Sequence, residues 1–533
     1  MREAAARYGT GRVLPFRESL LAMIGISLVN MLVALDQTVV STALPSIVSE
    51  LKGFEYYAWI VTSYLLASVV TVPVFGRLGD FFGRKPFVIA AISTFTVASV
   101  LCGFAQSMQF LMVMRAFQGV GAGMMVGTAF AAIPDLFPDP HSRVRWQVVM
   151  AGAYGIGTAS GPSLGGLLSQ HYGWRSTFFV NVPVGIISLA CVIIYLPFSR
   201  HKHEEEVQID WAGAVLVSIA LGSLQLFVEL LPKNGFGVSN LALVVLFLFS
   251  SATLLWWEKR ASHPIIPLDL FRDPSLNAVF LLSLLVGFLM FSLIFFAPLL
   301  LQGGFGLTPQ RAGLLVTPLA GCIAFGSIFN SRIVTRLSNP TRMLTAGYSL
   351  IAISCVALSL IGPSTSYWIL GISMLTGGIG MGFIFNNLNV FGQELAGQGR
   401  FGITTALIQS TRMVGGMLGT ALIGTLVTRT YIARVPVALT SSLGNLPSSL
   451  VNRLRNPEVL VDRRAGEVLL SHVGHAAGNA SLFAPVLRRV FVTSIHLGFA
   501  VTALAAIAAV WQVRRISHMR FHQVSVDAIP VLD

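Results

Sequence analysis

Residues 20–47 read LLAMIGISLVNMLVALDQTVVSTALPSI, an apolar stretch that contains a single charged residue, Asp36. A stretch of this length is sufficient to cross the hydrocarbon core of a bilayer as an α-helix, which takes about 20 residues. A charged side chain deep in such a helix costs at least about 2.5–3.5 kcal/mol, so it is expected to face a cavity, to pair with a partner or to have a function. The stretch therefore predicts a membrane-spanning helix that carries a functional carboxylate.

The rest of the chain has the composition of a polytopic membrane protein. Its 533 residues are 54% hydrophobic and 11% charged, with a mean hydropathy of +0.75, whereas soluble domains contain about 25% charged residues. Apolar runs of about 20 residues recur along the whole chain and predict fourteen membrane-spanning helices. We expect them near residues 19–42, 57–76, 87–106, 109–132, 147–169, 176–197, 211–231, 238–256, 277–301, 312–331, 343–362, 366–390, 402–428 and 490–513.

Basic residues are distributed unevenly between the predicted loops. If alternate loops lie on opposite sides of the membrane, the side that holds both termini carries 21 Lys and Arg residues and the other side carries 12. Because cytoplasmic loops carry the excess of Lys and Arg, both termini are predicted to be cytoplasmic. The first apolar run is too long for a signal peptide and lacks a small-residue cleavage site, so we expect it to be retained. Membrane topology thus explains the net charge of +13, and we expect no nucleic-acid partner.

The two halves of the chain resemble each other. The glycines of QGVGAGMM at 118–125 recur in GGIGMGFI at 377–384, and the basic turn GRLGDFFGRKP at 76–86 has a degenerate counterpart at 331–342. Transporters use repeated halves to build a central site that opens alternately to each side. We predict an all-α fold of two six-helix bundles with two inserted helices. The expected divisions are a first bundle at 1–198, a cytoplasmic linker with the inserted helices at 199–274, a second bundle at 275–515 with a long extracytoplasmic loop at 433–488, and a cytoplasmic tail at 516–533.

The turn after the second span resembles the signature cytoplasmic loop of the major facilitator superfamily. The residues that match G-x-L-x-D-x-x-G-R-K are Gly76, Leu78, Asp80, Gly83, Arg84 and Lys85. The glycines permit a tight reversal of the chain, and a carboxylate at position 80 would be stabilised by the unpaired amides of a helix N-terminus. The resemblance implies that this turn, which we call the latch loop, holds the two halves together in the outward-facing state. The alternative is that its basic residues only fix the topology.

Three further stretches narrow the resemblance. R-x-x-Q-G-x-G-x-G at 115–123 is similar to the motif of proton-coupled members, and LDQTVVSTALP at 35–45 is similar to the fourteen-span drug:proton antiporters of the EmrB/QacA type. G-x-x-x-G-P-x-x-G-G in span 5 resembles the antiporter motif and consists of Gly157, Gly161, Pro162, Gly165 and Gly166. Glycines four residues apart give a helix a smooth face for close packing, and the proline bends the helix. We expect either a gate between the halves or a packing seam.

Asp36 has a candidate partner in Arg115 of span 4. Each residue lies about six positions, or ~9 Å of helix rise, from the outer end of its span, so the two charges share a depth. Arg115 would favour the ionised form of Asp36, and apolar surroundings would oppose it. We predict that this pair couples proton movement to transport in a cavity that the substrate enters. The alternative is a static ion pair, and His496 and Glu229 are the next candidates for carrying the proton.

Other polar residues within the spans are candidates for the substrate pocket. An unpaired arginine in the middle of span 13 would be costly, so Arg412 should meet an anion, a cluster of carbonyl groups or water. The side-chain amides either line a pocket or form hydrogen bonds between helices. The predicted substrate-binding residues are Gln37, Gln118, Asn181, Asn386, Asn387 and Arg412.

These features predict a secondary exporter rather than an enzyme or an ATP-driven pump. The sequence has no G-x-x-x-x-G-K-[ST] loop, so we expect a proton gradient to supply the energy, with no cofactor and no metal. The resemblance implies antiport of protons against amphipathic or cationic organic compounds across the bacterial cytoplasmic membrane, that is, multidrug efflux and antibiotic resistance. The alternative is a facilitator or proton symporter for a specific polar metabolite. Besides the lipid bilayer and the substrates, a periplasmic adaptor protein is the candidate partner, at the loop 433–488.

Overall fold

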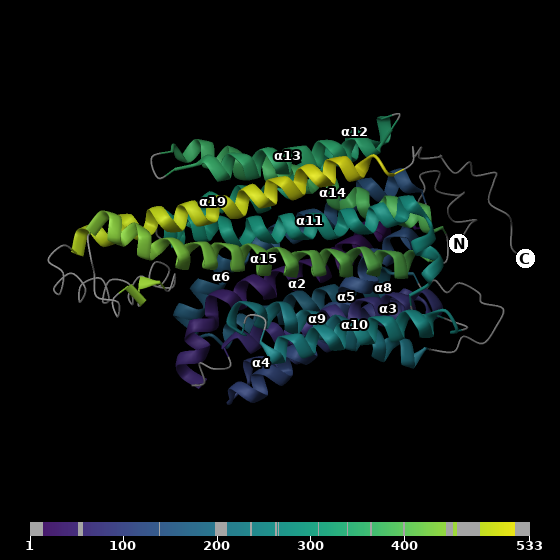
Figure 1. Ribbon diagram of the computed structural model, residues 1–533. Helices are drawn as coiled ribbons and strands as arrows, with labels where there is room; N and C mark the ends of the chain where they lie inside the picture. Colours follow the sequence, from purple (N-terminus) through teal and green to yellow (C-terminus); the bar gives the residue numbers. More distant parts are fainter. Residues whose placement is uncertain are drawn as a thin grey trace, which may run out of the picture.

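The structure is a computed structural model that describes residues 14–51, 57–137, 139–197, 210–234, 237–261, 264, 266–307, 309–337, 339–362, 365–397, 400–443, 451–452, 454–455 and 480–516. In these residues the secondary structure is helical, and they contain no β-strand. The long helices run side by side and form an elongated bundle (Figure 1). The all-α membrane fold predicted from the sequence is confirmed.

We divide the helices into three groups. The N-terminal half contains α2 (Phe16–Leu51), α3 (Tyr57–Phe82), α4 (Arg84–Gly103), α5 (Met108–Leu136), α6 (Pro140–Tyr172), α7 (Ser176–Phe179) and α8 (Asn181–Tyr195). The inserted helices are α9 (Trp211–Asn234) and α10 (Val238–Glu258). The C-terminal half contains η2 (Leu268–Arg272), α11 (Pro274–Leu299), η3 (Leu300–Gly304), α12 (Pro309–Ile333), η4 (Val334–Arg336), α13 (Thr341–Leu360), α14 (Tyr367–Ala396), α15 (Phe401–Leu443) and α19 (Ala480–Val513).

Within the described residues, 13 helical segments are long and apolar enough to cross a membrane. The sequence predicted fourteen, and the difference is the span expected at 147–169, which lies in α6. This helix is rich in Gly and Ser, and these residues make it less hydrophobic than its neighbours. It has 33 residues and runs beside α2 along the bundle (Figure 1). Length and composition therefore support 13 spans within the described residues. α6 is long enough to cross a membrane but less apolar, and it packs beside α2 as a further long helix of the bundle.

Short turns and side-chain caps set the ends of several helices. Gly83, between α3 and α4, has a φ of 87°, a left-handed conformation that favours glycine, so the tight reversal predicted for the latch loop is present. Asp139 accepts a hydrogen bond from the backbone N–H of Ser142 (2.8 Å), and Asp273 accepts one from Ser275 (2.7 Å). These carboxylates satisfy amides that the first turns of α6 and α11 leave unpaired.

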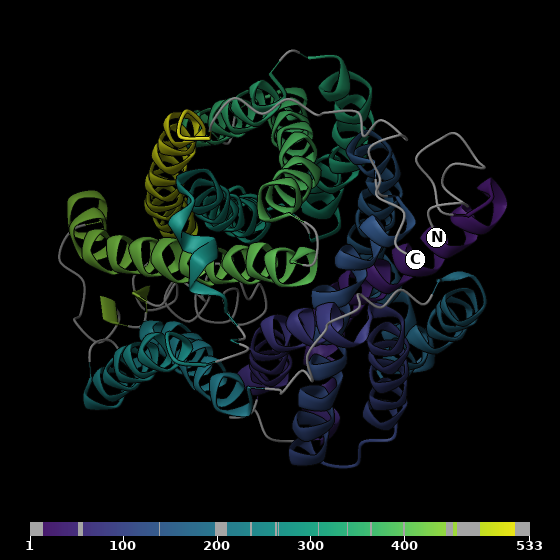
Figure 2. The same cartoon turned by 90° about the vertical axis from the view of Figure 1, so that its right-hand side faces the viewer.

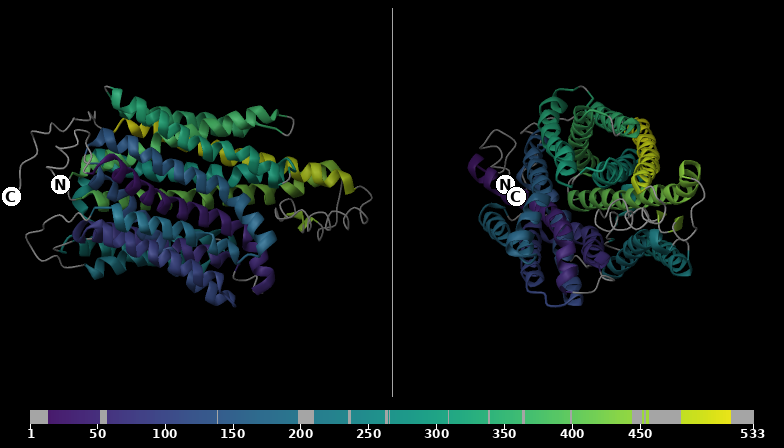
Figure 3. Two further views of the ribbon diagram at one scale, coloured as in Figure 1. Left: turned by 180° about the vertical axis from the view of Figure 1, so that it is seen from behind. Right: turned by 90° about the vertical axis from the view of Figure 1, so that its left-hand side faces the viewer.

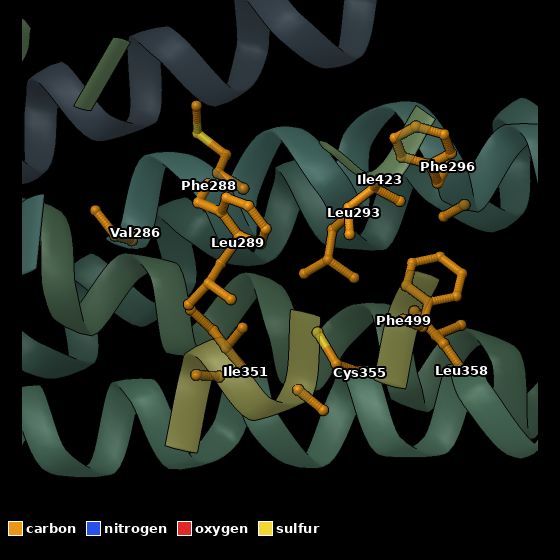
Figure 4. Close-up of a cluster of buried hydrophobic side chains, with 14 of the residues drawn as sticks. Val286, Phe288, Leu289, Leu293, Phe296, Ile351, Cys355, Leu358, Ile423 and Phe499 are labelled. Carbon is orange, nitrogen blue, oxygen red and sulfur yellow. The ribbon is translucent and has the colours of Figure 1, made fainter. Parts of the chain in front are cut away.

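Each half has its own hydrophobic core. The largest buried cluster draws its residues from between Leu270 and Ile516, and the next from between Ala22 and Leu196. Figure 4 shows part of the first cluster, in which Leu293 of α11, Cys355 of α13 and Phe499 of α19 lie close together. Each half is therefore stabilised by burial of its own apolar side chains.

The glycine ladders of α5 and α14 make equivalent contacts in the two halves. A Cβ atom added to Gly119 would lie 2.2 Å from the carbonyl oxygen of Tyr64 in α3, and one added to Gly378 would lie 2.2 Å from the carbonyl oxygen of Leu319 in α12. In both places the absence of a side chain lets two helices approach until their backbones touch. The repeat seen in the sequence thus corresponds to a repeated helix contact.

The inserted helices lie beside the N-terminal half and opposite α15 (Figure 2). α9 contacts both α3 and α15, whereas α10 packs against α9. Large apolar side chains such as Leu248 and Phe249 are exposed on α10, as expected for a surface that faces lipid. The inserted pair therefore contacts both halves chiefly through α9.

α15 and α19 extend past the other helices at one end of the bundle (Figures 1 and 3). α15 continues to Leu443 and α19 begins at Ala480, so the loop predicted over 433–488 is helical at both of its ends. Tyr431 explains part of this extension, because its buried hydroxyl donates a hydrogen bond to the carbonyl oxygen of Leu454 (3.2 Å) and its ring packs edge-on against Phe491. The span predicted at 402–428 was shorter than α15, because it covered only the part whose apolar composition suits a membrane.

Several predicted segments lie outside the described residues: the rest of the loop at 444–450, 453 and 456–479, the linker at 199–208 and the tail at 517–533. We call the end of the bundle where α3 meets α4 the Asp80 end, and the end where α15 and α19 extend the distal end.

Candidate functional site

A buried hydrogen-bond network surrounds Asp36 on α2. Nη1 of Arg115 donates to Oδ2 of Asp36 (2.6 Å), while Nε2 of Gln118 (2.8 Å) and Nδ2 of Asn181 (2.9 Å) donate to Oδ1. The donors are on α5 and α8, and Asp36 is 0% exposed. The carboxylate is thus compensated by a cation and by two amides, which a buried charge requires.

Further contacts hold Arg115 in place. Its Nε donates to the carbonyl oxygen of Ile60 (3.3 Å), and its Nη1 also donates to Oε1 of Gln118 (2.7 Å). The guanidinium carbon lies 4.3 Å from the centre of the Tyr64 ring, a distance at which the cation is attracted to the ring face. The shared depth of Asp36 and Arg115 was visible in the sequence, but the contributions of Ile60 and Tyr64 depend on how α3 packs against α5.

Gly119 brings Tyr64 to Arg115. It follows Arg115 by one helical turn, and its contact with the Tyr64 carbonyl oxygen leaves no space for a Cβ atom. A side chain at this position would push α3 away from α5 and separate the ring from the guanidinium. The glycine ladder therefore determines the geometry of the charge pair as well as the packing of the helices.

The network continues from Asn181 to α4 and α7. Nδ2 of Asn181 also lies 3.1 Å from Oγ of Ser99, which donates to the carbonyl oxygen of Phe178 (2.8 Å). The three hydrogen bonds that Asp36 accepts all come from N–H groups. A proton on the carboxylate would turn one of its accepting positions into a donor. The proton would occupy one of the four lone-pair sites of the carboxylate and remove its negative charge, so the charge-assisted hydrogen bond from Arg115 would be weakened. Protonation of Asp36 would therefore alter how α2 is held against α5 and α8.

A small cavity lies between the two halves. It is lined by Asn30, Phe130 and Tyr154 of the N-terminal half and by Met290, Ile323, Phe385, Asn386 and Arg412 of the C-terminal half. Its volume is ≈ 60 Å³, which is space for about two water molecules. We expected Asp36 and Arg115 to face the substrate cavity, but neither lines it, because the surrounding helices enclose the pair.

Two of the predicted substrate-binding residues, Asn386 and Arg412, line this cavity. The guanidinium carbon of Arg412 lies 4.9 Å from the centre of the Phe385 ring. Asn387 points elsewhere and exchanges hydrogen bonds with Asn330 of α12 (2.8 and 3.2 Å). It forms an interhelical contact, which was the alternative left open by the sequence.

The other predicted polar residues lie away from the cavity lining. Gln118 and Asn181 are occupied by Asp36, and Gln37 is half-buried beside Tyr64. His496 of α19 contacts the carbonyl oxygen of Ile361 (2.8 Å) in the C-terminal half. Glu229 is on α9.

Asp80 joins the two halves of the protein. Its Oδ1 accepts the backbone N–H of Gly402 (2.7 Å) and its Oδ2 accepts that of Ile403 (2.8 Å), at the N-terminus of α15. Arg84 donates to Asp80 (2.8 Å) and to Asp135 (2.5 Å). The carboxylate thus caps a helix of the opposite half, where unpaired amides and the helix dipole stabilise a negative charge. Asp135 was not recognised in the sequence as part of this cluster.

Gly76 allows α3 and α15 to approach each other closely. A Cβ atom on Gly76 would lie 2.3 Å from the Cβ of Ala406, and one on Gly402 would lie 2.5 Å from the carbonyl oxygen of Gly76. Leu78 is buried, and Lys85 donates to the carbonyl oxygen of Ile193 in its own half (2.7 Å). The small residues therefore form the contact between halves at this point.

A second contact between the halves was not predicted from the sequence. Nη1 of Arg143 on α6 donates to Oε1 of Gln393 on α14 (3.1 Å), and its guanidinium forms an ion pair with Glu394. Gln393 in turn donates to Oγ1 of Thr405 on α15 (3.0 Å). Arg143 and Glu394 are 251 positions apart, so no local pattern marks them as partners. Together with Asp80, this group closes the interface at the Asp80 end.

The glycine motif of α6 packs against α2 of the same half. A Cβ atom on Gly157 would lie 2.8 Å from the carbonyl oxygen of Met31, and one on Gly161 would lie 1.7 Å from Oγ1 of Thr38. For these two glycines the contact is therefore packing within one half rather than a gate between halves, and it fixes the part of α2 that carries Asp36. The remaining residues of the motif, Pro162, Gly165 and Gly166, are in the same helix.

The fold, the repeated halves and the buried charge pair agree with the comparison to protein families. The chain belongs to the Major Facilitator Superfamily, whose family model matches residues 26–420.

Curated relatives are similar along most of the chain. Multidrug resistance protein 3 of Bacillus subtilis (strain 168) is 29% identical over 440 residues, which cover 82% of this chain and 85% of that protein. Multidrug transporter protein MdtP of the same organism is 29% identical over 476 residues, or 87% of each chain. The tetracenomycin C resistance and export protein of Streptomyces glaucescens is 29% identical over 483 residues, or 90% of this chain and 88% of that protein. These similarities support a multi-pass membrane transporter of the multidrug type.

A solved structure shares the fold. The human organic anion transporter MFSD10 aligns with a TM-score of 0.59 and 13% sequence identity, covering 92% of this chain and 100% of that chain.

Proposed function

We propose that this protein is a proton-coupled antiporter that exports amphipathic organic compounds across the bacterial cytoplasmic membrane, with both termini in the cytoplasm. We further assign it to the fourteen-span drug:proton antiporters of the EmrB/QacA type, on the motifs in its first half. The observation that carries the proposal is Asp36, a carboxylate 0% exposed that accepts hydrogen bonds from three side chains on two other helices. Since the sequence has no nucleotide-binding loop, an ion gradient is the energy source.

α2 connects the proton site to the cavity. Asp36 and Asn30 lie on this helix six residues apart, and Nδ2 of Asn30, which lines the cavity, donates to the carbonyl oxygen of Met150 on α6 (3.2 Å). When a proton reaches Asp36, the loss of its negative charge weakens the bond from Arg115 on α5 and loosens α2, and the movement is transmitted to the cavity wall. Substrate and proton then favour different positions of α2, and they compete in this way although they bind at separate sites.

Alternating access requires that the two ends of the bundle open in turn. In this state the Asp80 end is held closed by the cap on α15 and by the Arg143 cluster. We propose that proton release from Asp36 and breakage of these contacts occur in the other half of the transport cycle, in which the Asp80 end is open. Helix contacts of this kind have two discrete arrangements. A small change in free energy at Asp36 is therefore sufficient to change the populations of the two states.

The cavity lining favours amphipathic compounds over a polar metabolite. Phe130, Tyr154 and Phe385 supply aromatic surface, and Met290 and Ile323 supply adaptable apolar surface. Sites for polar nutrients need a dense set of hydrogen-bonding groups, whereas amphipathic ligands need apolar walls with a few polar groups. A symporter for a polar metabolite is therefore the weaker candidate.

The test measures protons and substrate together. Purified protein in weakly buffered detergent solution is mixed with ethidium or 1-pyrenebutyrate, and proton release is followed with a pH indicator. In parallel, vesicles with an imposed pH gradient report the direction of transport. We expect the native protein to release protons and Asp36→Asn to release none, with Asp36→Glu retaining part of the response. Transport in the same direction as proton flow would overturn antiport.

Glu50→Gln is the matched control. Glu50 is on the same helix as Asp36 and pairs with Arg175 at the distal end, where it is exposed. The hydrogen bond from Arg175 lowers the pKa of Glu50, so this carboxylate is already ionised at neutral pH and Glu50→Gln should release as many protons as the native protein. Undiminished release from Asp36→Asn would assign proton coupling to another group, with His496 and Glu229 tested next.

A further inference from the structure

The cavity between the halves contains one charged side chain. Arg412 is on α15, and none of the ion pairs formed by the described residues includes it. None of the eight residues that line the cavity is acidic. Asp36, the buried carboxylate of the candidate site, is enclosed by its own partners in the N-terminal half. An arginine at this depth without a counter-ion is costly, so it is expected to have a function.

Asn386 adds a second unpaired donor to the same cavity. Its side-chain Nδ2 has no hydrogen-bond partner, although the residue is 3% exposed. A buried amide without a partner costs free energy that a ligand can recover. Arg412 and Asn386 are both donors, and they lie on different helices that face one cavity. An oxygen atom that carries negative charge would satisfy both, and a guanidinium group binds a carboxylate with two parallel hydrogen bonds.

The walls next to these donors are aromatic. The Phe385 ring lies 4.9 Å from the Arg412 guanidinium, which orients the planar cation and leaves its edge for a ligand. Phe130 and Tyr154 come from the opposite half. Aromatic side chains provide large surfaces for stacking at low conformational cost. The cavity thus combines an anion-binding edge with surfaces for a flat ring system.

The backbone that carries Arg412 is fixed by close packing against α11. A Cβ atom on Gly287 would lie 1.9 Å from the carbonyl oxygen of Arg412, and one on Gly415 would lie 1.8 Å from the carbonyl oxygen of Leu284. These contacts hold α15 against α11 at the arginine itself and three residues after it. The charge is therefore presented from a rigid scaffold, which favours binding because little ordering is required when a ligand arrives.

We propose that Arg412 and Asn386 form the subsite for an anionic group of the substrate, and that the transported compounds are aromatic molecules carrying a carboxylate or a similar oxyanion. The inference rests on the proposed export function and names its substrate class. The present volume of ≈ 60 Å³ is the contracted form of this site, since pockets for organic ligands measure about 300–1,000 Å³. The site enlarges when its walls, which come from both halves, move apart.

The experiment compares three ligands that share one ring system. 1-Pyrenebutyrate is anionic, its amide is neutral, and the corresponding pyrenylbutyl-trimethylammonium is cationic. Binding to the purified full-length protein is measured at pH 7 by fluorescence polarisation, without a proton gradient. We expect the native protein to bind the carboxylate about tenfold more tightly than the amide or the cation, the difference expected for hydrogen bonds to a charged group.

The variants separate a local effect from a change in net charge. Arg412→Gln should remove the preference for the carboxylate, Arg412→Lys should keep part of it, and Asn386→Leu should weaken carboxylate binding but not amide binding. Arg332→Gln removes the same charge from an exposed position at the end of α12 and should bind like the native protein. If Arg412→Gln does not fold, the comparison of the three ligands on the native protein and on Arg412→Lys decides the question.

Equal binding of the three ligands by the native protein, or an unchanged preference in Arg412→Gln, would overturn the proposal. This binding preference is measured without a proton gradient, so it does not depend on proton coupling. A preference for the carboxylate together with an absence of proton release would support the anionic subsite and reject antiport, whereas proton release with a preference for the cation would do the reverse.

Discussion

Asp80 caps a helix of the other half: its Oδ1 accepts the backbone N–H of Gly402 at 2.7 Å, although the two residues are 322 positions apart. This contact exists only when α3 and α15 are together at the Asp80 end. The stability of the closed end therefore depends on a charge that satisfies helix amides and on an interface made of small residues.

Asp80→Asn should open the Asp80 end. Asparagine offers one acceptor oxygen in place of two and loses the charge, at a cost of about 1–2 kcal/mol, which changes the ratio of the two states by about tenfold. We expect transport to fall by a similar factor in reconstituted vesicles, while the amount of inserted protein is unchanged. A cysteine at Thr405, which is buried in the native protein, should react faster with a thiol reagent in a background without the four native cysteines.

Asp273→Asn is the control for this substitution. Asp273 caps α11 at the same end of the bundle but within one half. It should leave transport and the labelling of the new cysteine unchanged. Equal effects of both substitutions would show that general loss of acidic charge, and not release of the latch, lowers transport.

Gly76→Ala should disturb the same interface by steric overlap. Its Cβ would lie 2.3 Å from that of Ala406, and overpacking of this kind costs about 1–3 kcal/mol. Transport should decrease, and the double variant Gly76→Ala with Ala406→Gly should recover most of it because the overlapping methyl group is removed. Ala406→Gly alone is the control. A double variant no better than Gly76→Ala would argue that the two positions do not meet in the transport cycle.

Arg115→Met should destabilise the protein by about 3–5 kcal/mol, because Asp36 would be left buried without its cation. Adding Asp36→Asn should restore most of the thermal stability, measured as the melting temperature in detergent, but not proton-driven transport. Arg115→Lys keeps the charge but loses the bond to Ile60 and the stacking on Tyr64, so it should be intermediate. Recovery of transport by the double variant would identify the pair as a static ion pair.

Topology reporters fused after residues 203 and 460 should lie on opposite sides of the membrane. The prediction follows from the excess of basic residues on the side that holds both termini. Alkaline phosphatase should be active at 460 and inactive at 203, and green fluorescent protein should show the reverse. Activity of the same reporter at both positions would contradict this orientation.

The candidate site was partly predictable. Asp36 and Arg115 were identified because charges in an apolar span are conspicuous and because the span ends give their depth. In the structure Nη1 of Arg115 lies 2.6 Å from Oδ2 of Asp36. Arg143 and Glu394 were not paired in advance, since the contact depends on how two halves meet. The length of α15 was also missed, because hydropathy measures fit to a bilayer whereas a helix continues as long as its packing supports it.

The sequence by itself determined that this is an all-helical membrane protein of repeated halves with a charge pair inside the first half, because span length and the cost of buried charge are properties of the chain and the bilayer. Only the tertiary structure decided what each polar side chain faces. Asn386 and Asn387 are neighbours, separated by about 100° around one helix. Gly378 brings α14 against the backbone of α12 and thereby fixes the rotation of the helix. Asn387 is turned toward Asn330, and Asn386 is turned toward the cavity of Arg412.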